Sequence, residues 1–459
     1  MHRLDAEKNF DLGIFIIGCT SAFERVAQAL SDYCQSDVDA LVALLPFIID
    51  NLHIQQSLLR GRYMKAVAMM ENYGIPIDVK ILDLLQKHWN SIKELLIQRV
   101  DQQYGVFEGS AFKSDLFTNY LEREKISWPR LPSGKLDLKD ETFRQRSKTY
   151  PKISSLRELR HALDRLRLHQ IEVGDDGRSR VNLSPYGSIT GRNQPSTAKY
   201  IFGNAKWLRG LIRPIDGWAL AYIDWKQQEF GIAAALSGDL AMQKGYCSGD
   251  PYLEFSKQAG LVPENATKQT HPDQRRLCKA AVLSVHYGMG AESLATSINQ
   301  PVQMGRELLA HHRRAFPKFW QWSEGAVDYA LLYRKLWTVF GWELHLGSEV
   351  NTCSLANFPM QANGAEILRL ACCYMIEAGI RVCAPVHDAV LIEVPIRKME
   401  EEISKAKMLM ARASREVLSG FELGTDVVVF CYPERYCDED RGKDFWEMVI
   451  SEIDQLKNS

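Results

Sequence analysis

The chain has 459 residues, 46% of them hydrophobic, which is enough for sizeable cores and suggests about three domains. Its 56 lysines and arginines nearly balance 57 aspartates and glutamates, so the net charge predicts no particular partner and any nucleic-acid footprint has to be local. Ten cysteines without a Cys-x-x-Cys pair or a paired Cys/His spacing argue against disulfides and zinc. They favour buried thiols in a reducing compartment, so we expect a cytoplasmic protein.

The first part of the chain predicts one short strand followed by helices. The apolar run LGIFIIGC at 12–19 is short and follows acidic residues, so a buried strand is expected rather than a signal or membrane segment. Residues 20–110 are expected to be mostly helical. Within them, apolar residues recur at three- and four-residue spacing through LVALLPFIIDNLHIQQSLLRGRYMKAVAMMENYG at 41–74, up to a Gly-Ile-Pro stop. We therefore expect a long helical arm.

A loop-rich segment at 127–140 and a second helical stretch at 153–172 come next. Between Phe143 and His169, eight basic residues stand against two acidic ones. This local excess is typical either of a solvated helix face or of a surface that contacts phosphates, and both interpretations stay open here.

The next apolar strand delivers Asp224 at its end, and a helix begins almost at once, with Glu229 about one helical turn further on. A strand end holds a carboxylate rigidly. Asp224 is therefore either a metal ligand or the N-cap of the helix that follows.

The segment QRRLCKAAVLSVHYGMG at 274–290 predicts a helix that ends at Gly288, in the position of a C-terminal cap. Four of its side chains recur every four residues and share one face: Arg275, Lys279, Leu283 and Tyr287. Such a face suits a nucleoside triphosphate, because cations match phosphates and the other two positions can meet sugar and base. An amphipathic helix with a basic end gives a similar pattern.

The stretch APVHDAVLIEVP at 384–395 predicts two short strands folded back on each other, with Asp388 at the bend beside His387. An aspartate at a bend is usually a turn residue. It becomes a candidate metal ligand if a second fixed carboxylate, such as Asp224, converges on it.

These segments, taken in order, resemble the motifs of family A DNA polymerases, the class of bacterial DNA polymerase I and its phage relatives. DWKQQE at 224–229 resembles motif A, RRLCKAAVLSVHYG at 275–288 motif B, and VHDA at 386–389 motif C. SPYGSITGRNQPS at 184–196 is similar to the Thr-Gly-Arg segment of the family, and NFPMQANGAEILRLA at 357–371 to its Asn-x-Pro-Met-Gln helix.

The resemblance implies an α+β, mainly helical right hand with an antiparallel palm sheet, fingers and a thumb. It also implies phosphoryl transfer with two Mg²⁺ ions, for which Mn²⁺ is expected to substitute, held by the catalytic residues Asp224 and Asp388. Ala389 stands where many relatives carry Glu, which puts the supporting role of a third acid in doubt.

The resemblance assigns roles to further residues. Arg275 and Lys279 correspond to cations that bind the triphosphate, Glu229 to the side chain that crowds the sugar 2′ position, and Tyr287 to the residue against the templating end of the helix. Leu283 replaces the usual Phe or Tyr against the sugar, and Tyr252 stands roughly where relatives often have His. Gln227 completes the expected nucleotide site, and the expected DNA contacts in the minor groove are Arg192, Asn357, Gln361 and His387.

The expected division of the chain follows from the same resemblance. Residues 1–50 would be a remnant of an exonuclease-like domain, 51–180 the thumb, 181–240 and 336–459 the two parts of the palm, and 241–335 the fingers. The implied partners are primer-template DNA and deoxynucleoside triphosphates. A monomer without a membrane partner is expected.

Two other functions are alternatives to a DNA polymerase. A single-subunit RNA polymerase shares the motif layout, but the bulky acid Glu229 would obstruct a ribose hydroxyl. A catalytically decayed DNA-binding protein would have lost residues that are present here.

The stretch YCQSDVDALVALL at 33–45 resembles the last motif of a 3′–5′ exonuclease, through Tyr33 and Asp37. One carboxylate cannot hold two ions, so no proofreading is expected.

Overall fold

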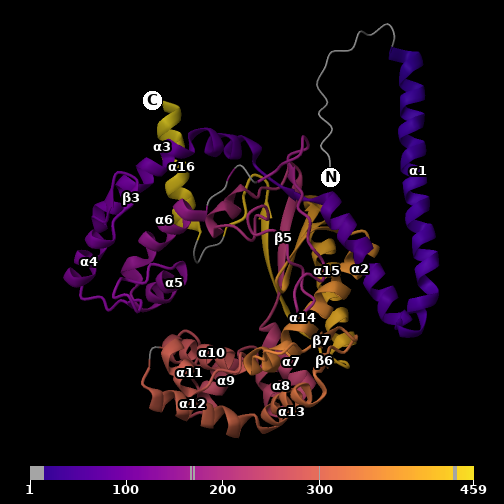
Figure 1. The fold of residues 1–459 in the computed structure, drawn as a ribbon. Coiled ribbons are helices and arrows are strands. Elements are labelled where there is room, and N and C mark those ends of the chain that lie inside the picture. The colour runs from indigo at the N-terminus through magenta and orange to yellow at the C-terminus, as the bar shows by residue number, and fades with distance from the viewer. Residues whose placement is uncertain (1–14, 166–167, 169–170, 299, 438–441, 459) are drawn as a thin grey trace. The chain divides into compact units, whose positions relative to one another are not determined.

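The computed structural model describes residues 15–165, 168, 171–298, 300–437 and 442–458 (Figure 1). The chain divides into two compact units, Met1–Gly61 and Arg62–Ser459. In the first unit the described residues form α1 (Phe15–Ile48), η1 (Ile49–Asn51) and the start of α2 (Ile54–Tyr73). Tyr33 and Asp37 both lie in α1.

The strand predicted at 12–19 is wrong for residues 15–19, which begin α1, and residues 12–14 lie outside the described part. The apolar run is too short to distinguish a strand from a buried or amphipathic helix by its period. Here it runs directly into the helical pattern that follows, and the helix extends through both.

The second unit opens with the predicted helical arm. The end of α2 leads through β1 (Ile75–Pro76) into α3 (Val79–Tyr104). Asp78 caps α3 by accepting from the backbone N–H of Ile81 at 3.4 Å, and Gly105 ends it at φ 64°, a left-handed conformation that glycine adopts without a Cβ clash. β1 pairs antiparallel with β4 (Arg178–Ser179).

A lobe with an aromatic core follows α3. Its elements are the hairpin β2 (Phe107–Glu108) and β3 (Ala111–Phe112), then α4 (Ser114–Arg123), α5 (Asp140–Thr149), η2 (Pro151–Ile153) and α6 (Ser154–Arg165). Phe117 lies at the centre, with its ring centroid 5.0 Å from that of Trp128 and 5.3 Å from that of Phe143.

Four of the eight basic residues between Phe143 and His169 make contacts inside this lobe. The guanidinium of Arg160 lies 4.2 Å from the ring centroid of Phe143 and 4.3 Å from that of Phe112. The other three form ion pairs: Arg144 with Glu141, Lys152 with Glu124, and Arg157 with Glu158. For these four residues a local structural role is therefore sufficient to explain the charge.

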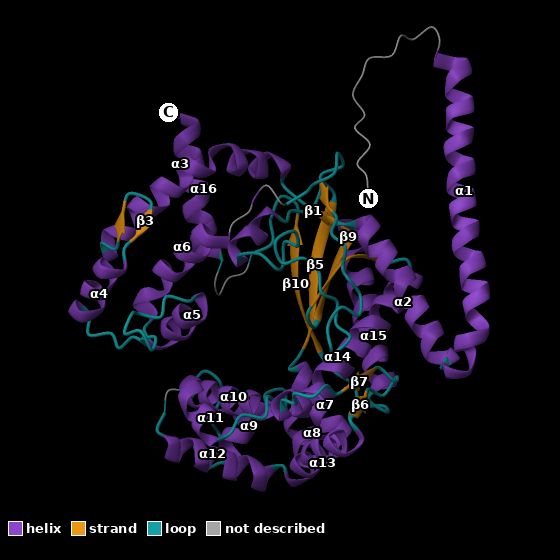
Figure 2. Ribbon diagram, in the orientation of Figure 1, coloured by secondary structure: helices purple, strands orange, loops and turns teal. Residues whose placement is uncertain are grey.

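The centre of the second unit is a four-stranded antiparallel sheet in the order β10-β5-β9-β8 (Figure 2). Its strands are β5 (Trp218–Trp225), β8 (Arg381–Val386), β9 (Ala389–Pro395) and β10 (Thr425–Cys431). The two long helices α14 (Thr352–Glu377) and α15 (Met399–Val417) pack against it. β8 and β9 are the predicted pair of strands, joined by a turn at His387 and Asp388.

A helical block between β5 and α14 carries the remaining predicted segments. It contains α7 (Gln228–Ser237), α8 (Leu240–Cys247), α9 (Pro251–Gln258), α10 (Pro272–His286), α11 (Ala291–Ser297), α12 (Val302–Ala315) and α13 (Pro317–Tyr333). The predicted cap is confirmed: Gly288 follows α10 at φ 67°. A small hairpin, β6 (Lys335–Trp337) and β7 (Glu343–His345), leads into α14.

The last helix, α16 (Lys443–Asn458), packs on α3 and on η4 (Lys206–Leu211). The ring of Trp446 lies so close to Gly210 that a Cβ on this glycine would come within 2.4 Å of it. Trp207 is 1% exposed and packs its ring against Trp89, Phe445 and Trp446. Residues of α16 therefore pack on α3, although the two helices are far apart in the sequence. η5 (Ile396–Lys398) joins β9 to α15.

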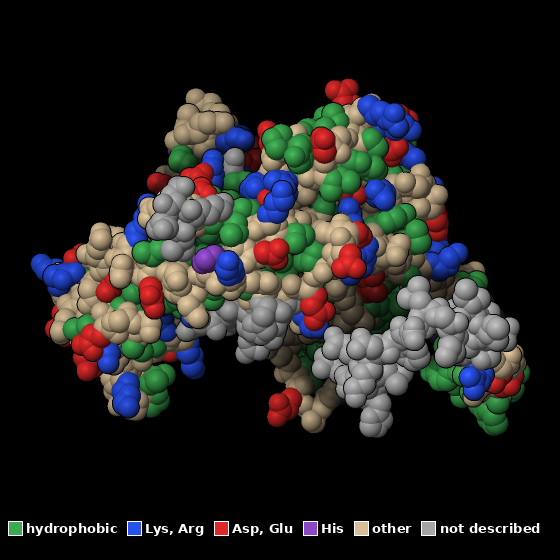
Figure 3. All heavy atoms as spheres, turned by 90° about the horizontal axis from the view of Figure 1, so that it is seen from above, with side chains coloured by type: hydrophobic (Ala, Val, Ile, Leu, Met, Phe, Trp, Pro, Cys, Tyr) green, Lys and Arg blue, Asp and Glu red, His purple; other side chains and the backbone are tan. Residues whose placement is uncertain are grey.

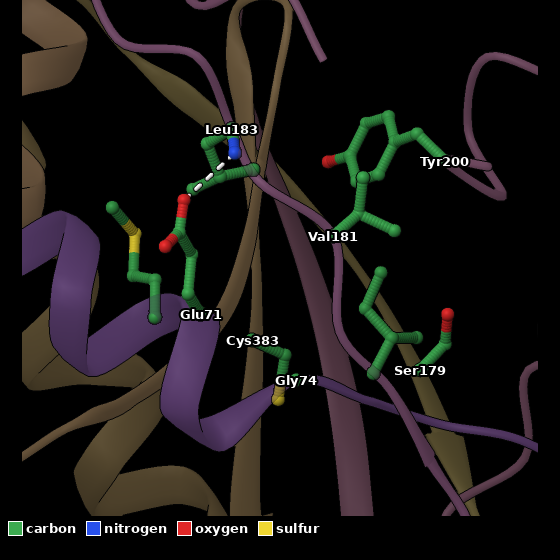
Figure 4. A pocket seen from close by; sticks show the side chains of 9 residues that line it. Glu71, Gly74, Ser179, Val181, Leu183, Tyr200 and Cys383 are labelled. Atoms are coloured by element: carbon green, nitrogen blue, oxygen red, sulfur yellow. Dashed lines mark hydrogen bonds between the residues drawn. The ribbon is translucent and has the colours of Figure 1, made fainter. Parts of the chain in front are cut away.

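None of the described helices is both long and apolar enough to cross a bilayer. On the face seen in Figure 3, basic and acidic side chains are interspersed. Figure 4 shows a small pocket lined by α2, the 179–183 segment and Cys383 of β8, in which the Glu71 carboxylate accepts from the backbone N–H of Leu183 at 2.7 Å. None of the residues that line this pocket was predicted as a site residue.

Candidate active site

The fold brings Asp224 and Asp388 to the same end of the sheet. Asp224 is the next-to-last residue of β5, and Asp388 lies in the turn between β8 and β9. Asp224 pairs with Ala389 in the ladder, and the backbone N–H of Trp225 donates to the carbonyl of Asp388 at 3.2 Å. The two aspartates are therefore neighbours at one end of the sheet, one at a strand end and one in a turn, although they are far apart in the sequence.

Burial and neighbouring negative charges dominate the electrostatics of Asp224. Burial raises its pKa to about 7, and the negative charges of Asp388 and Asp426 act in the same direction. Its Oδ1 atom is buried and has no hydrogen-bond partner among the described residues. A buried carboxylate oxygen left in this state is costly unless a cation approaches it.

These two carboxylates fit a divalent cation. No group of three or more His, Cys, Asp or Glu side chains in the described part of the chain is arranged to hold a metal. Mg²⁺ is commonly held by only one or two carboxylates, with waters and substrate phosphates completing its shell. Asp224 and Asp388 would supply the protein's share, and the Ala389 position adds no ligand.

Asp426 is a neighbour that the sequence did not reveal. It lies on β10 directly opposite Asp224, and its Oδ1 is 2.9 Å from the Nζ of Lys226. The run of valines after Asp426 favours a strand, but no pattern in the sequence gives the register of β10 against β5. Its carboxylate therefore could not be placed beside Asp224 in advance.

Four of the predicted site residues form one connected group. Hydrogen bonding from the Tyr287 hydroxyl lowers the pKa of Glu229, and hydrogen bonding from Gln361 lowers the pKa of Tyr287. Arg192 also approaches Glu229, with 4.0 Å between its Nη2 and the carboxylate Oε1. Burial raises the pKa of Glu229, while Arg192 and the Tyr287 hydroxyl oppose this change and the negative charge of Asp388 adds to it.

A separate set of contacts holds the backbone on either side of Arg192. The guanidinium of Arg369 donates to the carbonyl of Gly191 at 2.6 Å, and the indole of Trp342 donates to the carbonyl of Ile189 at 2.8 Å. Gly191 has φ 70°, and a Cβ there would lie 3.1 Å from the Trp342 ring. The loop that presents Arg192 is thus held by α14 and by the turn of the β6–β7 hairpin.

Asn357 and His387 also border this group. Asn357 is 5% exposed and its side-chain amide donates to the carbonyl of His286 at 3.2 Å, so it is bonded to the end of α10. His387 has φ 54° in its turn. Desolvation lowers the pKa of His387, Asp388 opposes this, and Arg192 with two cations that sequence reasoning missed, Arg209 and Lys206, lowers it further.

The predicted cation face of α10 packs around Tyr252. The ring centroid of this tyrosine lies 5.8 Å from the Arg275 guanidinium and 5.8 Å from the Lys279 ammonium group. Tyr252 is 4% exposed, and burial raises the pKa of its hydroxyl. Leu283 is half-buried on the same helix, and Gln227 precedes α7 in a left-handed conformation with φ 39°.

Comparisons with known proteins agree with this arrangement. The fold resembles the polymerase domain of Pol1 from M. smegmatis, a structure described as a complex with DNA primer-template and dNTP, with a TM-score of 0.65 and 19% identity over 85% of this chain and 70% of that one. The second unit therefore has the architecture of a polymerase right hand. The family model for DNA polymerase family A matches residues 195–427, about half of the chain. The chain belongs to DNA polymerase family A.

The similar curated proteins are DNA polymerases I from several bacteria. The thermostable enzyme of Thermus thermophilus is 28% identical over 211 residues, 43% of this chain and 25% of that protein. That of Thermus caldophilus is 24% identical over 76% of this chain and 45% of its own length, and the Aquifex aeolicus enzyme is 23% identical over 80% and 65%. The chain thus spans between a quarter and two thirds of the length of these relatives.

Proposed function

We propose that this protein is a template-directed DNA polymerase that adds deoxynucleotides to the 3′-hydroxyl of a primer. Membership of the family supports the activity. The observation that carries the proposal is the pairing of β5 with β9, which places Asp224 and its unpartnered Oδ1 beside Asp388. Phosphoryl transfer from a nucleoside triphosphate to a primer hydroxyl needs divalent cations at the reacting phosphate. Two neighbouring carboxylates can bind such cations.

In this proposal Asp224 and Asp388 hold two divalent ions, Mg²⁺ or Mn²⁺. When bound, such ions neutralise charge on the attacking and leaving oxygens. Arg275 and Lys279 bind the triphosphate of the incoming nucleotide, since both lie on one face of α10. Tyr252, Leu283 and Gln227 complete the proposed nucleotide site.

Glu229 excludes a ribose hydroxyl in this proposal. Its carboxylate is tied to Tyr287 and lies near Arg192, so it occupies a fixed place rather than swinging into solvent. A fixed bulky side chain discriminates by excluding the additional hydroxyl. Selection of deoxynucleotides would follow from its position.

The primer terminus is proposed to lie against Arg192, Gln361, Asn357 and His387. Donors at such positions can test a base pair in the minor groove, where the acceptor pattern of pyrimidine O2 and purine N3 is common to all correct pairs. Arg192 lies on a loop whose backbone is held by hydrogen bonds from Arg369 and Trp342. The contacts would be sensitive to pairing geometry but not to sequence.

The proposed division of the chain from residue 51 onward follows the elements. Residues 51–180 form the thumb with α3 and the aromatic lobe, residues 241–335 the fingers with α8–α13, and residues 181–240 with 336–459 the palm around the sheet. The proposed partners are primer-template DNA and deoxynucleoside triphosphates. We expect the chain to act in the cytoplasm as a monomer and, with only Asp37 of the exonuclease acids recognised, without proofreading by this chain.

A primer-extension assay tests the proposal. Purified protein is incubated with a labelled primer on a defined template, with each of the four deoxynucleotides or ribonucleotides, in Mg²⁺, in Mn²⁺ and in EDTA. We expect templated extension by deoxynucleotides with either metal and none in EDTA. If the protein binds the duplex without extending the primer, the proposed polymerase activity is wrong and a DNA-binding role is indicated.

A further inference from the structure

A carboxylate that the sequence did not single out is paired with one of the two cations of α10. The Oδ2 atom of Asp250 lies 2.5 Å from the Nε of Arg275, and both side chains are only about a quarter exposed. Asp250 is not on α10. It precedes α9, and so the ion pair joins two elements of the helical block.

The second oxygen of Asp250 is already committed. Asp250 is the N-cap of α9, and its Oδ1 accepts from the backbone N–H of Leu253 at 3.2 Å. Cap geometry fixes the carboxylate relative to the helix backbone. The oxygen that faces Arg275 is therefore held in place by the fold and not by the arginine.

The atom of Arg275 that Asp250 engages determines what remains free. A guanidinium presents donors on several edges, and the terminal nitrogens are those that grip a phosphate in bidentate fashion. Asp250 accepts from Nε, the nitrogen nearest the aliphatic stem. The Tyr252 ring, 5.8 Å from the guanidinium, packs close to the same side chain. Together these contacts limit the rotation of Arg275, and among the described residues no hydrogen bond or ion pair engages its terminal nitrogens.

We propose that Asp250 is a positioning residue for the incoming nucleotide: it orients the guanidinium of Arg275 so that the terminal nitrogens point at the triphosphate. This inference rests on the proposed function and adds a residue to it. A carboxylate near a triphosphate also repels it. In this inference the gain in nucleotide binding from orienting Arg275 is larger than the loss from that repulsion. Orientation and repulsion predict opposite effects when the charge is removed, so experiment can separate them.

Asp250→Asn is the informative variant. Asparagine caps a helix about as well as aspartate, but its single side-chain oxygen cannot serve the backbone of Leu253 and Arg275 together. Asp273→Asn is the matched control, since Asp273 lies in the first turn of α10 and pairs with Arg276 at 2.6 Å, with both side chains largely exposed. It removes the same charge from the same region without touching Arg275.

The test measures single-nucleotide primer extension by the wild type, Asp250→Asn, Asp273→Asn, Arg275→Ala and the Asp250→Asn/Arg275→Ala pair. We expect Asp250→Asn to raise the KM for the nucleotide about tenfold with a much smaller change in kcat, and Asp273→Asn to change KM less than about twofold. In the Arg275→Ala background, Asp250→Asn should have almost no further effect. An unchanged or lowered KM in Asp250→Asn overturns the inference, and so does an effect that persists undiminished without Arg275.

A binding measurement separates this inference from the proposed activity. The rise in melting temperature on adding a deoxynucleoside triphosphate and Mg²⁺ is recorded for the wild type, Asp250→Asn and Asp273→Asn, with no primer present. A smaller rise in Asp250→Asn alone supports the inference even if the wild type fails to extend primers, an outcome that would remove the proposed function. Equal rises in all three proteins, or none in any, overturn it.

Discussion

Arg369 and Glu366, one turn apart on α14, form an ion pair at 2.7 Å in which the side chains are 7% and 5% exposed. The same carboxylate accepts from the hydroxyl of Thr338 at 2.8 Å through its other oxygen, and Arg369 also supports the carbonyl of Gly191. This one pair therefore connects α14, the turn of the β6–β7 hairpin and the loop of Arg192. Removing one charge would leave the other buried and unpaired.

Glu366→Gln should lower the free energy of unfolding by about 3 kcal/mol, because a buried arginine loses its counterion. Glu324→Gln is the control, since Glu324 pairs with Arg313 at 2.6 Å in the open, with side chains 52% and 55% exposed; it should cost less than about 1 kcal/mol. Urea unfolding followed by circular dichroism measures both. Equal losses in the two variants would contradict the central role of the buried pair.

Asp224→Ala and Asp388→Asn should each abolish primer extension and leave affinity for primer-template nearly unchanged. The carboxylates would hold ions, whereas DNA affinity comes mainly from cations that contact the backbone. Extension and fluorescence anisotropy with labelled duplex measure the two properties. Asp216→Asn, in an exposed turn before β5, is the control and should extend normally. Sustained extension by either site variant would refute the assignment.

Asp224 should make the metal-free protein more stable at low pH than at high pH. Its folded pKa of about 7 lies above the usual value of 3.8, so its contribution is fully present below the unfolded pKa and is lost as pH rises through 7. Asp224→Asn should therefore stabilise the protein in EDTA at pH 8 by about 1–2 kcal/mol, a range that allows for partial screening by solvent. At pH 5 the gain should be smaller. Added Mg²⁺ should raise the melting temperature of the wild type only, and a gain independent of pH would contradict this explanation.

His286 should weaken the fold in acid. It is fully buried against Phe230 and Phe319, and neither ring nitrogen has a hydrogen-bond partner among the described residues. Burial lowers its pKa to about 4, so its contribution is present above the unfolded pKa of about 6.5 and is lost as pH falls toward 4. Unfolding free energies from pH 8 to pH 5 measure this loss, which at pH 5 should be about 2 kcal/mol smaller in His286→Phe than in the wild type.

The exposed residue His345 provides the control for this measurement, since its side chain is 74% exposed. His345→Gln should follow the wild type at every pH. His312, also buried near Phe319, contributes in the same direction because burial and the nearby His286 lower its pKa. Parallel pH curves for the wild type and His286→Phe would show that the buried imidazole does not set the acid limit.

Sugar selection should depend on Glu229 and Leu283. Glu229→Ala should open space at the 2′ position and increase ribonucleotide use by at least about tenfold, because a fixed steric block is removed. Leu283→Tyr should change the preference between ordinary and dideoxy nucleotides. Competition between nucleotide pairs in primer extension measures both ratios. If both ratios stay at wild-type values, the sugar is not where we place it.

The sequence predicted the two central aspartates because each has a local signature, a strand end for Asp224 and a hairpin bend for Asp388. The face of α10 was also predictable, because helical spacing alone places Arg275 and Lys279 together. Asp426 and Asp250 were not predictable in the same way. Their roles arise from strand register and from the packing of α9 on α10, and neither is a property of a local stretch.

The basic stretch after Phe143 is a second case in which the sequence did not reveal the contacts of a residue. Charge counting found the excess, but Arg160 is directed at aromatic rings and Lys152 at Glu124. Such pairing depends on partners elsewhere in the lobe. The strand predicted at 12–19 failed for a different reason, since an isolated short apolar run carries no period that would separate strand from helix.

The position of α16 has a consequence for how the protein is made. Trp207 packs against Phe445 and Trp446 of α16, and the same helix packs on α3, although α16 follows α3 in the sequence by more than 300 residues. During translation α3 emerges long before α16 exists, so an aromatic surface stays open in the meantime. α3 can reach its native packing only after α16 has been translated, and a premature stop codon before Lys443 would release a chain with that surface uncovered.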